Sequence, residues 1–304
     1  MARTKPSTST SARKPASRAR AKAKRLPAVL RARPSADDQH RSLLLHEHAG
    51  LETVAQAERF VHNVGFALRY GPHKTLPLAS MYAAVWRSVP TREPEAQMQR
   101  RATGLTNQLI ARGDVLETNA IADRVGLVHA SLIPALIAVV RRGRPVDDLE
   151  LSANARSVLG FLARTPRPTA GQVRAHLGVP AQTWPNAADD ALAELQRALV
   201  IDRGDTHVPE KGAAYLTKEG IPYRLIDDVH AAHVTAAIGL TVDAAAAQLV
   251  ERYLDGARFA TMKQLAKIFE ACLSPEELAA ALARLAGAVE IVAEGRTQIV
   301  LRRS

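Results

Sequence analysis

The sequence predicts a mainly α-helical protein with small β-hairpins, in which the second half contains one structural unit twice. Apolar residues recur at helical spacing through most of the chain, and the pattern changes to strand-like alternation after the last helix of each repeat. We expect four segments: a disordered basic tail at 1–38, a helical domain at 39–148, and one copy of the repeated unit at each of 149–238 and 239–304.

The composition is that of an ordinary globular protein, with 47% hydrophobic and 23% charged residues. The one cysteine, Cys272, excludes an internal disulfide and any multi-cysteine metal site, and it favours a reducing, cytoplasmic compartment. The most apolar stretch, 130–140, is far shorter than the roughly 20 residues that cross a membrane. The N-terminus lacks the apolar core of a secretory signal. We therefore expect a soluble protein without a membrane partner.

The net charge of +11 is not spread evenly along the chain. Residues 1–33 contain eleven lysines and arginines and no acidic residue, whereas the remainder has thirty basic and thirty acidic residues. A basic arm with few apolar side chains stays disordered and attracts phosphate, because each neutralised phosphate releases counterions. The alternative is a solubilising or targeting leader, such as a transit peptide. The tail residues predicted to contact nucleic acid are Arg18, Arg20, Lys22, Lys24 and Arg25.

Four segments between the tail and the repeats have apolar residues at helical spacing. They are 53–68, 78–85, 95–112 and 130–141. This region is expected to be helical, either as a plain helical domain or as a degenerate copy of the repeated unit, and the spacing does not define its topology.

The two repeats match in their helices and in their helix starts. Thr169 with Gln172, and Thr261 with Gln264, stand 92 residues apart, and each pair has the spacing of a capping box. The sequence Ser-Pro-Glu-Glu at 274–277 marks the start of the third helix of the second copy. Apolar residues of the two third helices correspond at Leu192, Leu195, Leu199 and Ile201 and at Leu282, Leu285, Val289 and Ile291.

A β-hairpin follows each third helix. In the second copy, alternating apolar residues at 289–291 and 299–301 flank a turn at 294–297. In the first copy, a strand at 200–202 and a break at 204–205 predict a return strand at 213–216. Three helices and a hairpin are the element order of a winged helix, so the second half is predicted to contain two of them in tandem.

The helix containing the Val64-Gly65 pair, followed by tandem winged helices, resembles the crosslink-repair DNA glycosylase family over residues 41–304. The resemblance implies winged-helix units that wrap damaged DNA and an activity that excises alkylated bases. Active members carry Gln-x-Gln or Gln-x-Asp after this glycine, and the alignment places Leu68 and Tyr70 at the two polar positions. Neither side chain can position water or stabilise a sugar cation as a carboxylate or amide does. The resemblance therefore implies the fold without the chemistry.

No other motif predicts an enzyme, a cofactor or a small-molecule substrate. His40, His46 and His48, and likewise His230 and His233, match no familiar metal spacing and are interpreted as surface or core histidines. The chain lacks a Gly-rich phosphate loop, a Gly-x-Ser-x-Gly elbow and a His-Glu-x-x-His pair.

The third helices fit a DNA-reading role imperfectly, because they carry several carboxylates that would repel phosphate. These acids are Asp189, Asp190, Glu194, Glu276 and Glu277. The candidate DNA contacts in the folded part are the helix and wing cations Arg197, Arg203, Lys211, Arg284, Arg296, Arg302 and Arg303. For each of them the alternative is an ordinary solvated charge.

The sequence thus favours a non-enzymatic, winged-helix protein that binds double-stranded DNA in a regulatory or DNA-repair role. Two alternatives stay open. One is a DNA glycosylase whose catalytic pair lies elsewhere, and the other is a scaffold that docks a protein partner through its acidic third helices.

Overall fold

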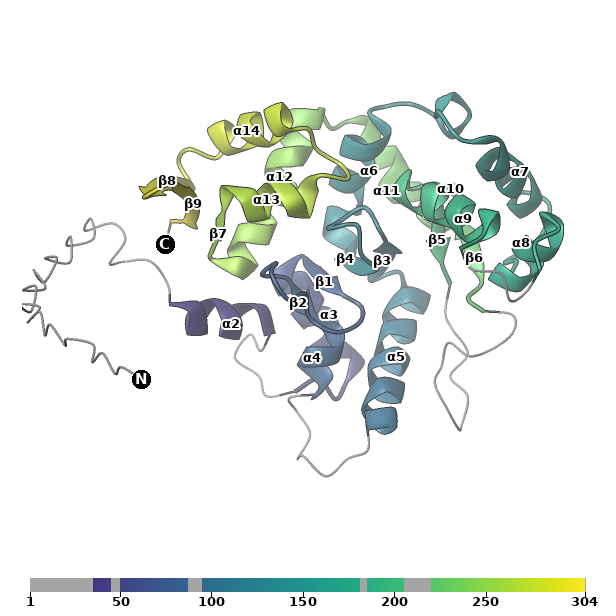
Figure 1. Cartoon of the computed structure of the whole chain (residues 1–304), viewed down its shortest axis with the longest axis horizontal. Coiled ribbons are helices and arrows are strands. Elements are labelled where there is room, and N and C mark those ends of the chain that lie inside the picture. Colours follow the sequence, from purple (N-terminus) through teal and green to yellow (C-terminus); the bar gives the residue numbers. More distant parts are fainter. Residues whose placement is uncertain (1–34, 45–49, 87–94, 181–184, 205–219, 304) are drawn as a thin grey trace, which may run out of the picture. The chain divides into compact units, whose positions relative to one another are not determined.

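The computed structural model describes residues 35–44, 50–86, 95–180, 185–204 and 220–303, and Figure 1 shows their arrangement. The described part is mainly helical with three small sheets, as predicted. Residues 1–34 of the predicted tail lie outside the described residues, as does the return strand predicted at 213–216. A helix, α2, begins at Ala36, within the last residues of the segment expected to be disordered.

The first region, which precedes the repeats, contains a sheet in addition to its helices. Its elements are α2 (Ala36–Leu44), α3 (Val54–Val64), β1 (Phe66–Leu68), β2 (Ala79–Ser80), α4 (Met81–Trp86), α5 (Glu95–Arg112), β3 (Val115–Thr118), β4 (Gly126–His129), η1 (Ala130–Leu132) and α6 (Ile133–Arg141). The strands pair in the order β2-β1-β4-β3, with β4 antiparallel to both of its neighbours.

Of the two expectations for this region, the plain helical domain is therefore not observed, and the structure differs from the predicted helices in two places. The helix predicted over 53–68 ends at Val64, because Gly65 adopts a φ of 75° and turns the chain into β1. Strands β3 and β4 were not predicted, because both are buried at all four positions. A fully buried strand shows no alternation of apolar and polar residues, so its sequence does not differ from that of a short buried helix.

The second region contains the first predicted repeat. Its elements are η2 (Val146–Asp148), α7 (Ala153–Leu162), α8 (Ala170–His176), α9 (Ala187–Arg197), β5 (Ile201–Arg203), β6 (Tyr223–Leu225) and α10 (Ile226–Val229). The strand that pairs with β5 is β6, which lies later in the chain than the return strand expected from the sequence. An isolated bridge joins Thr169, which begins α8, to Pro222 beside β6.

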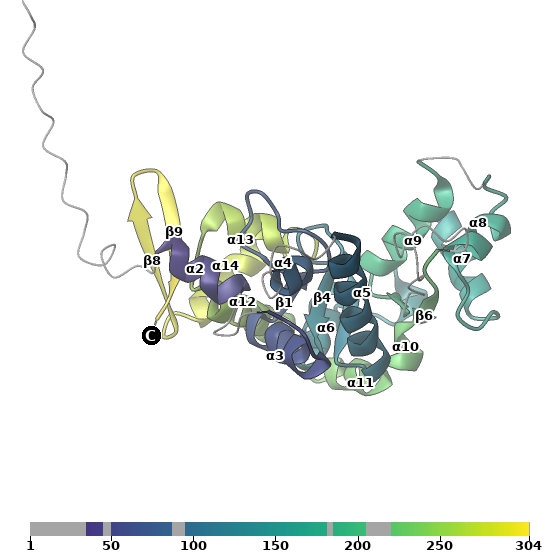
Figure 2. The same ribbon diagram turned by 90° about the horizontal axis from the view of Figure 1, so that it is seen from below.

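The third region contains the second predicted repeat. Its elements are α11 (Ala231–Ile238), α12 (Val242–Ala257), β7 (Phe259–Thr261), α13 (Met262–Phe269), α14 (Pro275–Arg284), β8 (Val289–Glu294) and β9 (Thr297–Arg302). The predicted hairpin is confirmed as β8 and β9, which project from the edge of the helices in Figure 2.

The predicted helix starts are confirmed at atomic detail. Thr169 and Thr261 each accept a hydrogen bond from the third backbone amide, and the glutamine there reaches back to the cap residue. Ser274 forms the same capping box with Glu277, with proline at the first helical position. These contacts lie within three residues of one another, which is why the sequence alone could predict them.

The first and third regions share one hydrophobic core, whereas residues 149–225 enclose a second one. Gly256 in α12 makes the close approach of α12 and α3 possible, because a Cβ atom there would lie 3.0 Å from Cα of Val64. Helix α2 also packs on α12, where Ser42 bonds the carbonyl of Gly256. The predicted domain boundaries stay a prediction.

Within the described residues, no single helix is long and apolar enough to cross a membrane. Helices α11 and α12 would qualify together by length and composition alone, and the chain bends by 120° between them.

Candidate nucleic-acid interface

An open pocket of about 550 Å³ lies where the chain leaves β1, against the turn between β3 and β4. Strand β1 pairs with β4, and the amide of Arg69 bonds the carbonyl of Val125 at 3.0 Å, which fixes the two walls together. The exposed cations in the pocket are Lys74 on one wall and Arg124 on the other. No acidic side chain is among the residues that line it.

Hydrogen-bond donors dominate this pocket. Nδ1 of His73 accepts from the amides of Thr75 and Leu76 at 3.2 and 3.1 Å, so Nε2 carries the proton and can donate. The pKa of the Tyr70 phenol is raised by burial, which keeps its proton in place at neutral pH. Lys74 and Arg124 add two cations, so the arrangement suits an anion such as a phosphate group.

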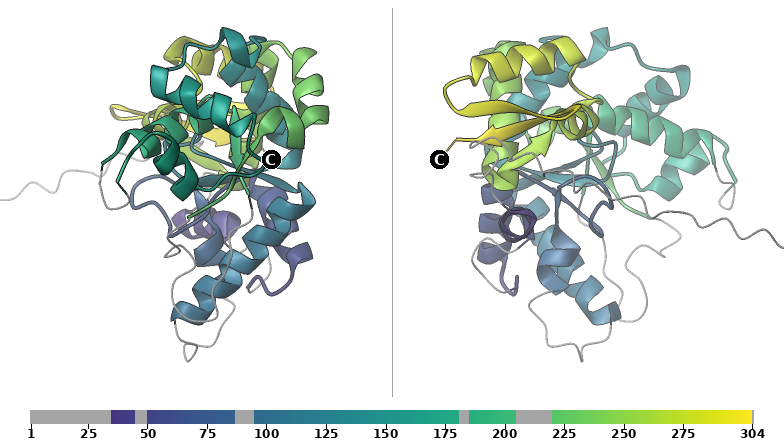
Figure 3. Two further views of the ribbon diagram at one scale, coloured as in Figure 1. Left: turned by 90° about the vertical axis from the view of Figure 1, so that its right-hand side faces the viewer. Right: turned by 60° about the vertical axis from the view of Figure 1, so that its left-hand side comes forward.

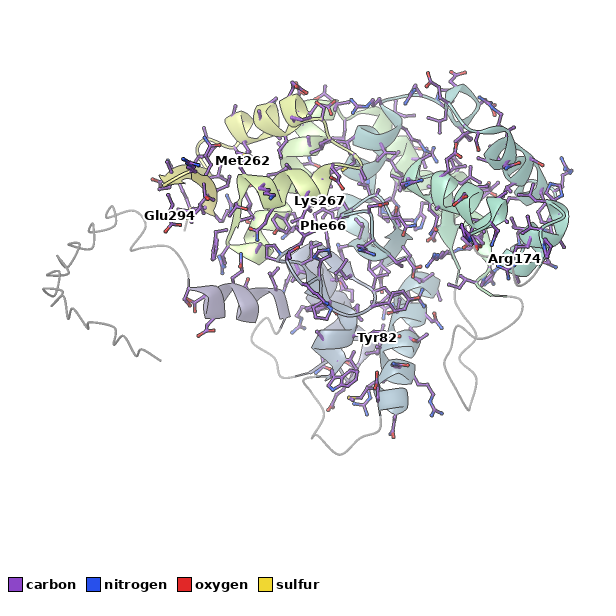
Figure 4. The ribbon with its side chains drawn as sticks, viewed as in Figure 1. Phe66, Tyr82, Arg174, Met262, Lys267 and Glu294 are labelled. Atoms are coloured by element: carbon purple, nitrogen blue, oxygen red, sulfur yellow. The ribbon has the colours of Figure 1, made fainter. Side chains whose placement is uncertain are left out.

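The two positions implied by the family resemblance lie at this pocket. Leu68 is almost fully buried in β1, and the ring of Tyr70 packs edge-on against Tyr82 at 5.5 Å between centroids. Figure 4 labels Tyr82 near α4 and α5. The residues that line the pocket include no carboxylate and no amide side chain.

A buried ion network lies beneath the pocket and joins the first region to the second. The carboxylate of Glu117 in β3 is fully buried, and it contacts Arg69 of the first region and Arg203 of β5, the latter at 2.9 Å. Burial alone would lower the pKa values of both arginines, but the charge of Glu117 raises them. Because one carboxylate is shared by two cations, the network holds β5 against β3.

A second buried carboxylate extends this junction. Asp202 is fully buried, contacts the guanidinium of Arg224, and accepts a hydrogen bond from the amide of Glu117 at 3.3 Å. Nε2 of His230 lies 3.5 Å from the same carboxylate. Thr118 adds a hydrogen bond to the carbonyl of Gln196 at 3.1 Å.

Two of the predicted DNA contacts are held in ion pairs with buried or half-buried carboxylates. Arg203 faces Glu117 in the network just described. Arg302 contacts Asp255 at 2.6 Å and Glu251 at 3.1 Å, and it also bonds the carbonyl of Ala288. Both guanidinium groups therefore hold strands against neighbouring elements.

The other predicted cations of the folded part lie at different places on the surface. Arg197 at the end of α9 is 3.6 Å from Asp123, and both side chains are about half exposed or more. Arg284, Arg296 and Arg303 are exposed. Lys211 and the tail cations Arg18, Arg20, Lys22, Lys24 and Arg25 lie outside the described residues.

Arg296 belongs to a groove between the β8–β9 turn and the start of α13. The groove has a volume of about 640 Å³, and Lys263 of α13 faces it together with Arg296. Met262 of α13 and Glu294 of the hairpin mark its neighbourhood in Figure 4. The loop after β1 also reaches α13, because Gln264 donates a hydrogen bond to the carbonyl of Thr75 at 3.2 Å.

Three of the five acidic residues named in the third helices have structural roles. Glu194 in α9 accepts from the amide and hydroxyl of Ser152, each at 2.7 Å, and so holds the N-cap residue of α7. Glu277 in α14 caps its own helix and contacts Arg142. Asp189 lies 3.6 Å from Arg174. These three carboxylates already bond groups of the same chain, which argues against a role for them in docking a protein partner.

The histidine and cysteine residues do not form a metal site in the described residues, where no group of three potential ligands converges. His230 is buried, as the sequence suggested for a core histidine. Cys272 is also buried, and burial raises the pKa of its thiol to about 12, so the thiol is unreactive at neutral pH.

The sequence did not predict this pocket, because basic and acidic residues were counted over the whole of the chain after the tail. Residues 60–113, which include Lys74, contain seven basic and two acidic residues, so this window is locally cationic within a neutral body. The Gly-Pro turn at 71–72 directly after an apolar run was a further signal of an exposed loop there.

Comparison with known proteins assigns the chain to a family. Residues 51–270 match the model of a family described as AlkZ related. A solved structure, the Streptomyces sahachiroi DNA glycosylase AlkZ, is similar at 14% sequence identity with a TM-score of 0.48, over 86% of this chain and 67% of that one. No curated protein matches. The chain therefore belongs to the AlkZ-related family.

Proposed function

We propose that this protein is a non-enzymatic DNA-binding protein that holds duplex DNA through its phosphate backbone, in a regulatory or DNA-repair role. The observation that carries the proposal is the pocket after β1, where Lys74, Arg124 and the Nε2 proton of His73 are present and acidic side chains are absent from the lining. The local excess of basic residues over 60–113 supports it, because phosphate attracts such a surface whatever the DNA sequence.

Winged-helix architecture is part of the proposal. In the third region the order is α12, β7, α13, α14, β8 and β9, with strands paired as β7-β9-β8. The first region follows the same plan with α3, β1, α4, α5, β3 and β4, paired as β1-β4-β3. The second region has three helices and the β5–β6 pair. The common plan supports three winged helices, one more than the sequence repeat indicated.

The proposal assigns no base excision to the pocket. Hydrolysis of a glycosidic bond needs a group that positions water or stabilises the sugar cation, and Leu68 and Tyr70 supply neither. Glu117 is the buried carboxylate beneath the pocket, and two arginines hold it. We expect duplexes carrying alkylated bases to remain intact with the purified protein. Release of free base in proportion to protein, and its loss on denaturation, would favour the glycosylase alternative.

A double variant tests the backbone contact directly. Lys74→Ala with Arg124→Ala should lower affinity for a labelled duplex about tenfold, measured by fluorescence anisotropy at several salt concentrations. Removing two phosphate contacts should reduce the slope of log affinity against log salt by roughly 2. The matched control is Arg59→Ala, an exposed arginine of α3, a helix that lies away from α13 in Figure 2. Parental affinity and slope in the double variant would overturn the proposal.

The basic tail is expected to add to this affinity. Truncation should remove residues 1–33 and stop before Ser35, because Ser35 accepts hydrogen bonds from the first turn of α2, which packs on α12. The truncated protein should bind any duplex more weakly and with a flatter salt dependence. Equal affinity and slope before and after truncation would assign the tail to another role.

A further inference from the structure

The pocket after β1 has two walls, and helix α13 holds both of them. Gln264 of α13 donates a hydrogen bond to the carbonyl of Thr75 at 3.2 Å, in the loop that follows β1. One helical turn later, the carbonyl of Ile268 accepts a hydrogen bond from the amide of Ala122 at 2.7 Å, in the turn between β3 and β4. Both walls are therefore fixed before a ligand arrives, which lowers the entropic cost of binding.

The turn between β3 and β4 has an unusual backbone. The amide of Arg124 bonds the carbonyl of Ile121 at 3.2 Å, and the two residues between them, Ala122 and Asp123, have φ values of 55° and 49°. This is the pattern of a type I′ turn, in which asparagine and glycine are usual. Residues with a Cβ atom keep such φ values where the surroundings hold them, and Ile121 and Ala122 are buried. The turn thus fixes the backbone from which the Arg124 side chain leaves.

Three side chains of the pocket can donate hydrogen bonds to an anion. Lys74 and Arg124 are exposed, and neither side chain forms an ion pair with another described residue. His73 presents its Nε2 proton, because its Nδ1 accepts from backbone amides of the same loop. An arginine offers two parallel N–H groups to phosphate oxygens, and a lysine offers a point charge. The lining thus supplies three separate donor groups.

DNA presents phosphate groups of two kinds. A phosphodiester inside the backbone carries one negative charge and two free oxygen atoms, with a sugar on each side. A phosphate monoester at a strand end carries about −1.5 to −2 charges at pH 7 and three free oxygen atoms, with a sugar on one side only. Three donor groups, with no acidic side chain in the lining, match the monoester better. A recess between two loops also admits a strand end more readily than a continuous backbone.

The pocket has room for the nucleotide that carries this phosphate. Its volume of about 550 Å³ lies within the roughly 300–1,000 Å³ typical of small-ligand sites. Leu68, Pro72 and Val125 line it with apolar atoms, and Tyr70 adds an aromatic ring. A sugar or base can pack on this surface while the phosphate bonds the donor groups.

We propose that the pocket after β1 binds a terminal phosphate monoester of DNA, at a strand end or a nick, in preference to a phosphodiester of the continuous backbone. The proposal rests on the proposed DNA-binding function and adds to it the kind of DNA that the protein selects. Lys74 and Arg124 bind oxygen atoms of the phosphate from the two walls, and His73 donates to the third oxygen atom.

Dumbbell duplexes of one sequence, closed by a hairpin loop at each end, test this preference by fluorescence anisotropy. One is continuous, and the others carry a central nick with a 5′-phosphate, a 3′-phosphate or hydroxyl groups only. We expect one phosphorylated nick to bind about tenfold more tightly than the hydroxyl nick, and that arm identifies which strand end the pocket takes. A methyl ester on that phosphate, which leaves a diester with one charge, should abolish the gain.

Variants assign the preference to the pocket. Lys74→Ala with Arg124→Ala should bind all the dumbbells with nearly equal affinity, whereas the control Arg59→Ala should keep the parental preference. A preference that survives in the double variant would overturn the inference. If the parent binds phosphorylated and hydroxyl nicks equally while the double variant loses affinity for all of them, the inference fails and the proposed function stands. A parent that binds none of the dumbbells at low salt would overturn the proposed function as well.

Discussion

Helices α5 and α14 occupy the same place in the order of elements, after two helices and before a strand pair, but they present different surfaces. The half-buried and exposed positions of α5, which lies at the lower edge of both views in Figure 3, carry glutamine, asparagine and arginine around Gly104, and Arg112 there pairs with Asp114 at 2.8 Å. Half of the exposed positions of α14 are alanine, at Ala279, Ala280 and Ala283, and the others are Pro275, Glu276 and Arg284. The same topological position therefore does not imply the same role, and side-chain chemistry decides which helix is suited to DNA.

Helix α9, the equivalent helix of the second region, differs again, because neighbouring elements contact it on two sides. Gln196 is buried, and its carbonyl accepts a hydrogen bond from Thr118 of β3. Glu194 bonds Ser152, the N-cap residue of α7. A helix held between two neighbouring elements cannot enter the major groove of DNA, whereas a helix with one open face can.

The largest expected effect concerns the junction that covers α9. Glu117→Ala should lower the free energy of unfolding by about 3–5 kcal/mol, because it leaves two buried guanidinium groups without their counterion. Urea denaturation measures this. Glu150→Ala, an exposed carboxylate, serves as the control and should change stability little. A loss below 1 kcal/mol would mean that the network does not hold the two regions together.

The comparison of α5 with α14 predicts a difference in binding. Gln108→Glu places a carboxylate on the exposed side of α5, within the cationic window 60–113 on which the proposed function rests, and should lower duplex affinity about tenfold, or about 1.4 kcal/mol. Ala280→Glu places the same charge on the exposed side of α14 and should change affinity less than twofold. Anisotropy at one salt concentration suffices for both. A larger loss in Ala280→Glu would transfer the DNA-facing role to α14.

The two copies of the capping box should have similar energetic weight. Thr169→Ala and Thr261→Ala each remove the hydroxyl that accepts the third backbone amide of a helix, and each should cost about 1 kcal/mol of stability. Serine at either position should restore most of the loss. If only one alanine variant is destabilised, the repeat does not use the two caps equivalently.

The smallest effect concerns Glu277 of α14, one of the acids in the scaffold alternative. The Arg142 guanidinium lowers the pKa of Glu277, so this contact adds stability above the usual pKa range of glutamate and loses it as the pH falls below that range. Arg142→Ala should lower stability at pH 7 by at most about 1 kcal/mol, since the pair is partly exposed. It should also flatten the decline in stability on acidification. The control Arg59→Ala should keep that decline.

The sequence predicted the parts of the fold that depend on neighbouring residues. The capping pairs at Thr169 and Thr261, the start of α14 at Ser274, and the final hairpin all rest on contacts within a few positions. It did not predict β1, β3 and β4, since strands buried on both faces show no alternation.

The candidate site depended on contacts that no local pattern contains. Arg203 and Arg296 both follow a third helix as cations, but the first faces Glu117, which lies 86 positions earlier, and the second lies exposed at the hairpin turn. Lys74 and Arg124 come together only because β1 pairs with β4.

The sequence by itself determined a mainly helical chain with repeated caps, a closing hairpin and a resemblance to the family to which the chain belongs. Tertiary structure decided which charged side chains neutralise one another and which face outward. The physical reason is that helix caps and turns are set by hydrogen bonds within a few residues, whereas burial and ion pairing depend on segments tens of residues apart.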